Sequence, residues 1–162
     1  RYLPKIASLL VKLGVNQFQF AFMHGMGNAD KNFESMMPSV SLASPYIKKG
    51  LQIGIDNHIK VMAEAMPFCV MEGYEKYVSE LYIPDTEIRT GKTYDPNFTY
   101  TRKNSGKIKF PFCKECKYDI ICEGPWKEYP EKMGSDEFTP VKEVDSDIIE
   151  LINNKSKGEP HR

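Results

Sequence analysis

The sequence predicts an α/β fold in which strand–helix units build a parallel sheet and a smaller, irregular, cysteine-rich module follows. Three observations support this prediction. Apolar residues recur at helical spacing in residues 4–13, 45–55 and 72–82. The segments between these helices contain two stretches of period-two alternation, which is typical of strands. After residue 84 no long apolar period survives, and three of the four cysteines of the chain lie beyond that point.

The first strand–helix unit opens with a helix over residues 4–13, which Gly14 ends. Residues 16–23 then alternate as a strand. Residues 24–30 are too rich in Gly and Asn for regular structure, so we expect a loop there. The strand has one phenylalanine face and one largely polar face, formed by Phe18, Phe20 and Phe22 and by Gln17, Gln19, Ala21 and Met23 respectively.

The second unit begins at Ser44-Pro45, a pair that predicts a helix N-cap followed by Pro in the first helical position. Apolar residues recur every four positions behind it, at Ile47, Leu51 and Ile55. We expect a second strand over residues 59–66, ended by Pro67. A short helix over 72–82 completes the unit.

Two strands cannot complete a barrel or a doubly wound sheet, because they leave an open edge and an uncovered face. This half of the chain is therefore interpreted as the end of a longer α/β array, and the absence of an initiator Met favours the C-terminal part of a larger protein. Gln19 and Glu64 lie on the polar strand faces and are expected to look into a cavity. The alternative is that both face solvent at an exposed sheet.

The domain boundary is placed near residue 84. Residues 1–84 form the βα units, residues 85–154 the cysteine-rich module, and 155–162 a polar tail. Within the module we expect a small hairpin from residues 99–101 and 107–110. A final amphipathic helix is indicated by a set of apolar residues at helical spacing, Val144, Ile148, Leu151 and Ile152.

Composition narrows the class of protein. The chain has 22 Lys and Arg against 22 Asp and Glu, which removes the broad electrostatic argument for nucleic acid or an anionic membrane. No apolar run approaches the roughly 20 residues of a membrane-spanning helix, and no secretion signal is visible. We therefore expect a cytoplasmic protein with no membrane partner.

The cysteines are the strongest chemical signal. Cys113 and Cys116 form a Cys-x2-Cys pair, and Cys122 follows after five residues. A Cys-x2-Cys pair in a chain without a secretion signal favours a metal site over disulfides. Cys69 is the remaining candidate for a fourth thiolate, the alternative being a small buried apolar residue. Four thiolates suit both Zn²⁺ and a [4Fe–4S] cluster, so spacing leaves the metal open.

Two residues beyond the first strand are further candidates for cavity contacts. His24 ends this strand, and Asn28 follows in the Gly-rich loop. Active-site residues of α/β barrels gather at the ends of strands in this way. Together with Gln19 and Glu64 they form the predicted cavity set.

The module resembles a known extension. Cys113-x2-Cys116-x5-Cys122-x-Gly124, followed by Tyr129-x4-Gly134-x2-Glu137-Phe138-x-Pro140, is similar to the C-terminal extension of radical S-adenosylmethionine enzymes of the SPASM and twitch type. Upstream, Gly14-Val15, the loop from His24 to Asn28, and Met66-Pro67-Phe68-Cys69 resemble the last βα units of that family's partial (β/α)6 barrel.

The resemblance implies an auxiliary [4Fe–4S] cluster on the four cysteines. It also implies that the complete enzyme holds a second [4Fe–4S] cluster and S-adenosylmethionine, and takes electrons from a reductant such as ferredoxin or flavodoxin. Its 5′-deoxyadenosyl radical would act on a peptide or small-molecule substrate in the lumen. The missing N-terminal half of the barrel would be a partner of these residues.

Two departures from the family pattern limit this expectation. Trp126 stands where the full SPASM motif has a further Cys, so these residues can bind at most one auxiliary cluster. The Cys-x3-Cys-x2-Cys motif of the radical-generating cluster is absent from the 162 residues. This chain alone is therefore expected to be inactive towards S-adenosylmethionine.

Two other readings stay open. The first is a non-catalytic zinc-binding interaction module, in which basic and aromatic residues near the cysteines would suggest nucleic acid, although Glu115, Asp119 and Glu123 interrupt that patch. The second is an enzyme relic that serves as a scaffold. The basic residues concerned are Lys107, Lys109, Lys114 and Lys117.

Overall fold

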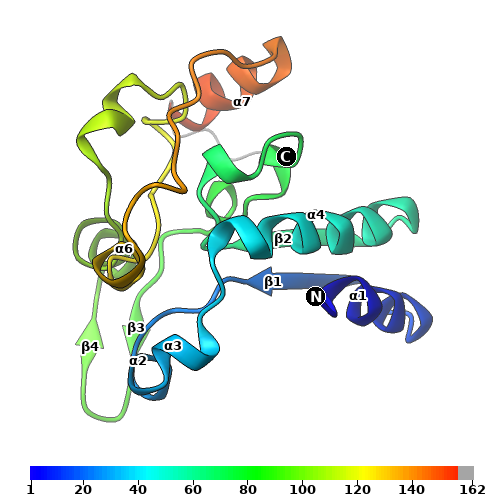
Figure 1. Ribbon diagram of the computed structural model, residues 1–162, viewed down its shortest axis with the longest axis horizontal. Helices are drawn as coiled ribbons and strands as arrows, with labels where there is room; N and C mark the ends of the chain where they lie inside the picture. Colours follow the sequence, from blue (N-terminus) through cyan, green and yellow to red (C-terminus); the bar gives the residue numbers. More distant parts are fainter. Residues whose placement is uncertain (157–162) are drawn as a thin grey trace.

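The computed structural model describes residues 1–156, so residues 157–162 of the predicted tail lie outside the described residues. The helices are α1 (Leu3–Lys12), α2 (Asn28–Lys31), α3 (Phe33–Met36), α4 (Val40–Asp56), α5 (Phe98–Thr101), α6 (Glu128–Met133) and α7 (Ser146–Ser156). The strands are β1 (Gln17–Ala21), β2 (Lys60–Glu64), β3 (Ile88–Arg89) and β4 (Tyr94–Asp95) (Figure 1).

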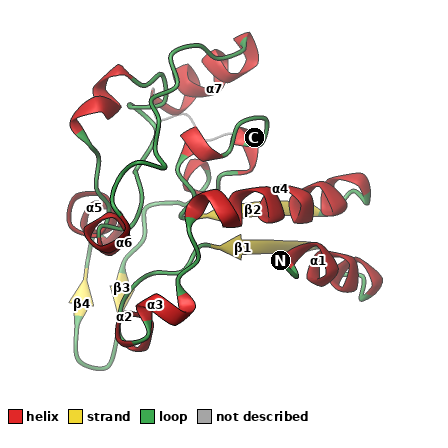
Figure 2. Ribbon diagram, viewed as in Figure 1, coloured by secondary structure: helices red, strands yellow, loops and turns green. Residues whose placement is uncertain are grey.

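The predicted strand–helix–strand unit is confirmed. β1 and β2 pair in parallel, with a register that runs from Gln17 opposite Lys60 to Ala21 opposite Glu64. The long helix α4 connects them and lies alongside the pair (Figure 2). Within residues 1–156 the sheets are this pair and the small β3–β4 hairpin, so the larger barrel remains a prediction.

The phenylalanine face of β1 packs under α4, as the sequence predicts. Phe18 and Phe20 are buried, and α4 meets them with glycines. A Cβ atom added at Gly54 would lie 2.2 Å from Cγ1 of Val61 and 2.8 Å from the Phe18 ring, and one at Gly50 would lie 2.5 Å from the Phe20 ring. The two glycines therefore allow the helix to lie close against the sheet.

The predicted start of this helix at Ser44-Pro45 is wrong, because α4 begins at Val40 and contains Pro45. Three acceptors bind the first backbone N–H groups. The Ser39 hydroxyl accepts from Leu42 at 3.1 Å, the Tyr129 hydroxyl from Val40 at 2.9 Å, and the Glu137 carboxylate from Ser41 at 2.8 Å. Ser39 is therefore the N-cap that the sequence offered and Ser44 concealed, and two of the three caps come from the distant module.

The predicted helix over residues 72–82 is also wrong. Two short 3₁₀ turns stand there, Glu75–Tyr77 and Ser79–Leu81. Val78 between them is extended and forms an isolated parallel bridge with Ala63 of β2. Pairing with the sheet therefore overrides the helical spacing of these residues.

The predicted hairpin from residues 99–101 and 107–110 is wrong as well. The hairpin of the module is β3–β4, while Phe98–Thr101 forms α5 and Arg102–Gly106 a π-helical turn. The Asn97 side chain caps α5 by accepting from the Tyr100 amide at 3.0 Å. This local cap outweighs the strand propensity of the Thr-Tyr-Thr stretch.

The βα units and the module share one hydrophobic core across the predicted boundary at residue 84. Phe22, just after β1, meets Tyr129 of α6 edge-on, with ring centroids 5.6 Å apart. The predicted terminal helix is confirmed as α7, which buries Ile148, Leu151 and Ile152. The module is therefore packed against the sheet rather than tethered to it.

Tyr129 is expected to be a main anchor of this packing. In a Tyr129→Phe variant the buried Val40 amide loses its acceptor and Glu137 loses a donor, so the free energy of unfolding should fall by about 1–3 kcal/mol in urea titrations. Tyr94→Phe is the matched control, because the Tyr94 hydroxyl also donates to a carboxylate (Glu87) but lies on an exposed ring. Equal losses in both variants would contradict the anchoring role.

Glu137 makes this cap pH-dependent. Burial alone would raise the pKa of Glu137, but hydrogen bonds from Ser41, Tyr129 and Val40 together lower it below the ordinary value of 4.5. A folded-state pKa below the unfolded one adds stability above the unfolded pKa, and this stability is lost as the pH falls. In urea titrations, wild type should therefore have a larger unfolding free energy than Glu137→Gln at pH 7. This difference should shrink as the pH falls below about 4.5.

Candidate metal centre

The four cysteines line one cavity. Cys69 lies in a 3₁₀ turn, Phe68–Val70, soon after β2. Cys113 lies in the 3₁₀ turn Pro111–Glu115, and Cys116 and Cys122 follow on the same loop. All four are free thiols and are partly buried. Two segments far apart in sequence thus bring the predicted ligands to one place.

Backbone amides donate to three of these thiols. Phe110 N–H points to Cys113 Sγ, Gly124 N–H to Cys122 Sγ, and Val141 N–H to Cys116 Sγ, each with an N···S distance of 3.4 Å. Such donors stabilise a thiolate and tune the potential of a metal bound to it. The loop is therefore arranged for sulfur in its anionic form.

Gly124 is required by this arrangement. It has a φ of 81°, in the left-handed region that favours glycine. A Cβ atom there would lie 1.9 Å from the carbonyl oxygen of Ile108. The backbone strand of residues 107–108 can pass this close to the cysteine loop only because residue 124 has no side chain.

Burial favours the protonated form of three of the thiols, Cys69, Cys113 and Cys122. Burial, together with repulsion from the nearby Cys122, Cys116 and Cys113, raises the pKa of Cys69 to about 12. Burial also raises the pKa of Cys113 and of Cys122, while Lys109 acts in the opposite direction on both. All four thiols line one cavity, so a metal group bound there would hold them as thiolates.

Four thiols around one cavity are a donor set that suits Zn²⁺ and a [4Fe–4S] cluster alike. In residues 1–156, no three His, Cys, Asp or Glu side chains stand as a group that could hold a metal ion.

The cavity set predicted from the strands is brought together only in part. Gln19 and Glu64 are joined by a hydrogen bond from the Gln19 amide to the Glu64 carboxylate. Asn28 is exposed at the start of α2, where its carbonyl oxygen accepts from the Asn32 side chain. Among the described residues, none of the hydrogen bonds or ion pairs joins Asn28 to the other three.

His24 lies against the module. Its ring stacks on Trp126, with centroids 3.8 Å apart and planes at 7°, and its Nε2 lies 3.1 Å from the Glu128 carboxylate. Lys107 Nζ lies 4.1 Å from the centroid of the same Trp126 ring. Trp126 therefore contacts His24, in the loop after β1, and does not line the cysteine cavity.

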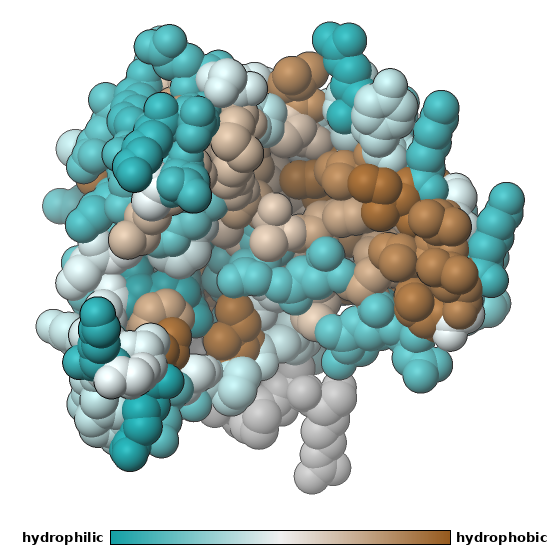
Figure 3. All heavy atoms as spheres, turned by 90° about the horizontal axis from the view of Figure 1, so that it is seen from below, coloured by the Kyte–Doolittle hydropathy of each residue, from teal (hydrophilic) through white to brown (hydrophobic). Residues whose placement is uncertain are grey.

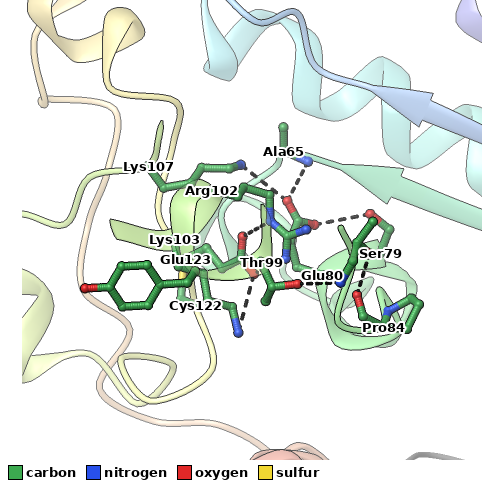
Figure 4. A network of polar contacts seen from close by, with 12 residues as sticks. Ala65, Ser79, Glu80, Pro84, Thr99, Arg102, Lys103, Lys107, Cys122 and Glu123 are labelled. Carbon is green, nitrogen blue, oxygen red and sulfur yellow. Dashed lines mark hydrogen bonds and ion pairs between the residues drawn. The ribbon is translucent and has the colours of Figure 1, made fainter. Parts of the chain in front are cut away.

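Sequence reasoning missed a buried network of charges (Figure 4). Arg102 donates to both oxygens of Glu123 at 2.8 and 2.7 Å, and Lys107 Nζ lies 3.4 Å from Glu80. Glu80 also accepts from the amide of Ala65, the residue that follows β2, at 2.8 Å. These charged residues belong to no apolar repeat of the sequence. No periodic pattern could therefore have predicted that they are buried.

This network corrects one element of the alternative reading. Lys107 is 5% exposed and so does not belong to a basic surface patch. Lys109 is committed to Asp119, whose carboxylate lies 3.1 Å away. Only Lys114 and Lys117 of the suggested nucleic-acid patch are exposed and have no ion pair within the described part of the chain.

Comparisons of the chain with protein-family models, curated proteins and solved structures found no match. The functional assignment therefore depends on the residues themselves. In the described residues, no helix combines the length and the apolar character that crossing a membrane demands.

Proposed function

We propose that Cys69, Cys113, Cys116 and Cys122 bind one auxiliary [4Fe–4S] cluster. The observation that carries the proposal is the convergence of four free thiols, from two separate segments, on one cavity. The amide donors to three of the sulfurs add support. When bound, such a cluster supplies one-electron chemistry or an anchor for substrate.

We further propose that the chain is the C-terminal part of a radical S-adenosylmethionine enzyme. The resemblance of the cysteine motif favours this, and so does the parallel βα unit beside it. Because Cys69 follows β2 by a few residues, the cluster would lie near the carboxyl ends of the strands, where α/β barrels bind substrates. Gln19, Glu64 and His24 would contribute to the wall of that cavity.

The surface of α1 suits a larger barrel. Apolar atoms gather over this end of the molecule (Figure 3), and Ile6, Leu9 and Leu13 are 44%, 55% and 68% exposed. Among the described residues β1 has β2 as its only partner strand, so its other edge is open. Further βα units would pair with this edge and cover the helix.

A zinc-binding interaction module is the second candidate function. The cysteine spacing favours it as much as a cluster, because four thiolates are also a structural zinc set. Under this proposal the exposed Lys114 and Lys117 beside the cysteines would contact a partner macromolecule. The cluster is preferred because the cysteine motif resembles that of the SPASM and twitch extensions.

Cysteine variants test the cluster. After anaerobic reconstitution, Cys113→Ala, Cys116→Ala and Cys122→Ala should each lose most of the iron, the sulfide and the visible absorption of the wild-type protein. Glu115→Gln is the matched control, because Glu115 lies between two of these cysteines but is exposed and paired with Lys142. Full iron and sulfide binding by the Cys116→Ala variant would refute the assignment.

A separate assay tests whether this chain alone cleaves S-adenosylmethionine. The reconstituted chain, given dithionite and S-adenosylmethionine, should form no 5′-deoxyadenosine above the background of protein-free controls. The reason is that all four cysteines are assigned to the auxiliary cluster, which leaves no thiolates for a radical-generating one. Measurable 5′-deoxyadenosine would show that the cluster site is itself catalytic.

A further inference from the structure

A short segment connects the cysteine cavity to the loop after β1. Cys122 lines the cavity, and Trp126 stacks on the ring of His24. Residues 122–125, which lead from the cavity to Trp126, form no helix or strand. Movement of the Cys122 sulfur would therefore cross very little chain before it reached the Trp126 ring.

This segment has little freedom to absorb such a movement. Two backbone hydrogen bonds, each of 3.0 Å, join residues 106–108 to residues 125–127 on either side of an antiparallel bridge. Nearer the cavity, the Gly124 amide donates to Cys122 Sγ at 3.4 Å. The backbone between the Cys122 sulfur and Trp126 is therefore held as one unit.

The loop after β1 depends on this unit for its position. The His24 ring stacks on Trp126 with centroids 3.8 Å apart, and its Nε2 lies 3.1 Å from the Glu128 carboxylate. Gly25 is buried, and a Cβ atom there would lie 3.3 Å from Cβ of Glu128. In the described part of the chain, the last backbone hydrogen bond from this loop to β2 is that of the Phe22 amide, at 2.9 Å. The module therefore places the loop beyond that point.

The same unit reaches the end of β2. Lys107 Nζ lies 4.1 Å from the centroid of the Trp126 ring and 3.4 Å from the Glu80 carboxylate. Glu80 in turn accepts from the amide of Ala65, the residue after β2, at 2.8 Å (Figure 4). The ends of both strands are thus tied to one short piece of the module.

We propose that loading of the cysteine site sets the position of His24 beyond the carboxyl end of β1, with residues 122–128 as the relay. The inference rests on the proposed function. A metal group on the four sulfurs fixes Cys122 relative to Cys69, so the relay and the His24 loop become ordered together. The wall of the proposed substrate cavity is then complete only in the loaded protein, and substrate binds after the cluster is assembled.

Hydrogen–deuterium exchange of the full chain tests the relay. Backbone amides of residues 22–33 should exchange at least about fivefold more slowly in the chain reconstituted with iron and sulfide than in the metal-free chain. Residues 46–56 of α4 are the internal reference, because this part of the helix packs on α1 and the β1–β2 sheet. Equal slowing of both segments would show general stabilisation and overturn the relay.

A variant breaks the relay at its far end. His24→Ala should bind as much iron as wild type, because His24 does not line the cysteine cavity. Its residues 22–33, however, should exchange at the same rate with and without metal. His58→Ala is the matched control, since His58 is exposed in the turn after α4, and it should keep the full slowing. Undiminished slowing in His24→Ala would contradict the proposal.

The iron and sulfide content of each sample separates two kinds of failure. A wild-type chain with about four irons, whose residues 22–33 exchange as in the metal-free chain, would overturn the relay and leave the cluster in place. A chain that binds no iron would reject the proposed function and the relay with it.

Discussion

A Gly124→Ala variant is expected to lose about 3 kcal/mol or more of unfolding free energy and most of its bound iron. Two effects add at this residue. An Ala at a φ of 81° is strained, and its Cβ would lie 1.9 Å from the Ile108 carbonyl oxygen. The backbone must shift to relieve that contact, and the shift would move the residue 124 amide that donates to Cys122 Sγ. The loop that holds the cysteines would be displaced, and the metal site would be lost with it.

Gly134→Ala is the control for this variant. Gly134 has a φ of 79°, nearly the same as that of Gly124, but a Cβ atom there would meet nothing within 4 Å. The Gly134→Ala variant should therefore lose only about 1 kcal/mol of unfolding free energy, the cost of a strained backbone at this φ. It should keep its iron. Urea titration and iron content measure both quantities. Equal losses of stability and iron in the two variants would show that the close approach at Ile108 is unimportant.

A Cys69→Ser variant is expected to keep a cluster on three thiolates but to lose the link between the two parts of the chain. In the wild type the cluster joins residue 69, beside the sheet, to the loop of residues 113–122. Metal binding should therefore raise the melting temperature of the whole chain, and this rise should be much smaller in the variant. Mild oxidation should also yield a three-iron form in the variant, visible by electron paramagnetic resonance.

Thr139→Val serves as the comparison, since Thr139 lines the same cavity but carries no thiol. It should retain the full rise in melting temperature and a cluster that resists loss of one iron. If Cys69→Ser behaved like Thr139→Val, Cys69 would be a packing residue, and the fourth iron would be ligated by something other than this chain.

Much of the βα half could be predicted because its signals are local and periodic. The alternation of Phe18, Phe20 and Phe22 predicted a strand with one buried face, and the structure buries all three. The parallel pairing followed from the order of the elements. The convergence of the four cysteines followed from the Cys-x2-Cys pair and the place of Cys69 after a strand.

What could not be predicted depends on contacts between distant residues. The first turn of α4 has a local cap in Ser39, but its other two caps, Tyr129 and Glu137, lie 89 and 96 positions from the amides that they bind. No local pattern reveals those two. Val78 became extended because it pairs with Ala63. The burial of Lys107 depends on Glu80 and Trp126, which no single-sequence pattern connects to it.

The metal and sulfide content of the wild-type chain, purified without oxygen, tests the central claim most directly. The proposal predicts about four irons and four sulfides per chain, with no stoichiometric zinc. About one zinc, with neither iron nor sulfide, would contradict the cluster and establish the zinc module instead.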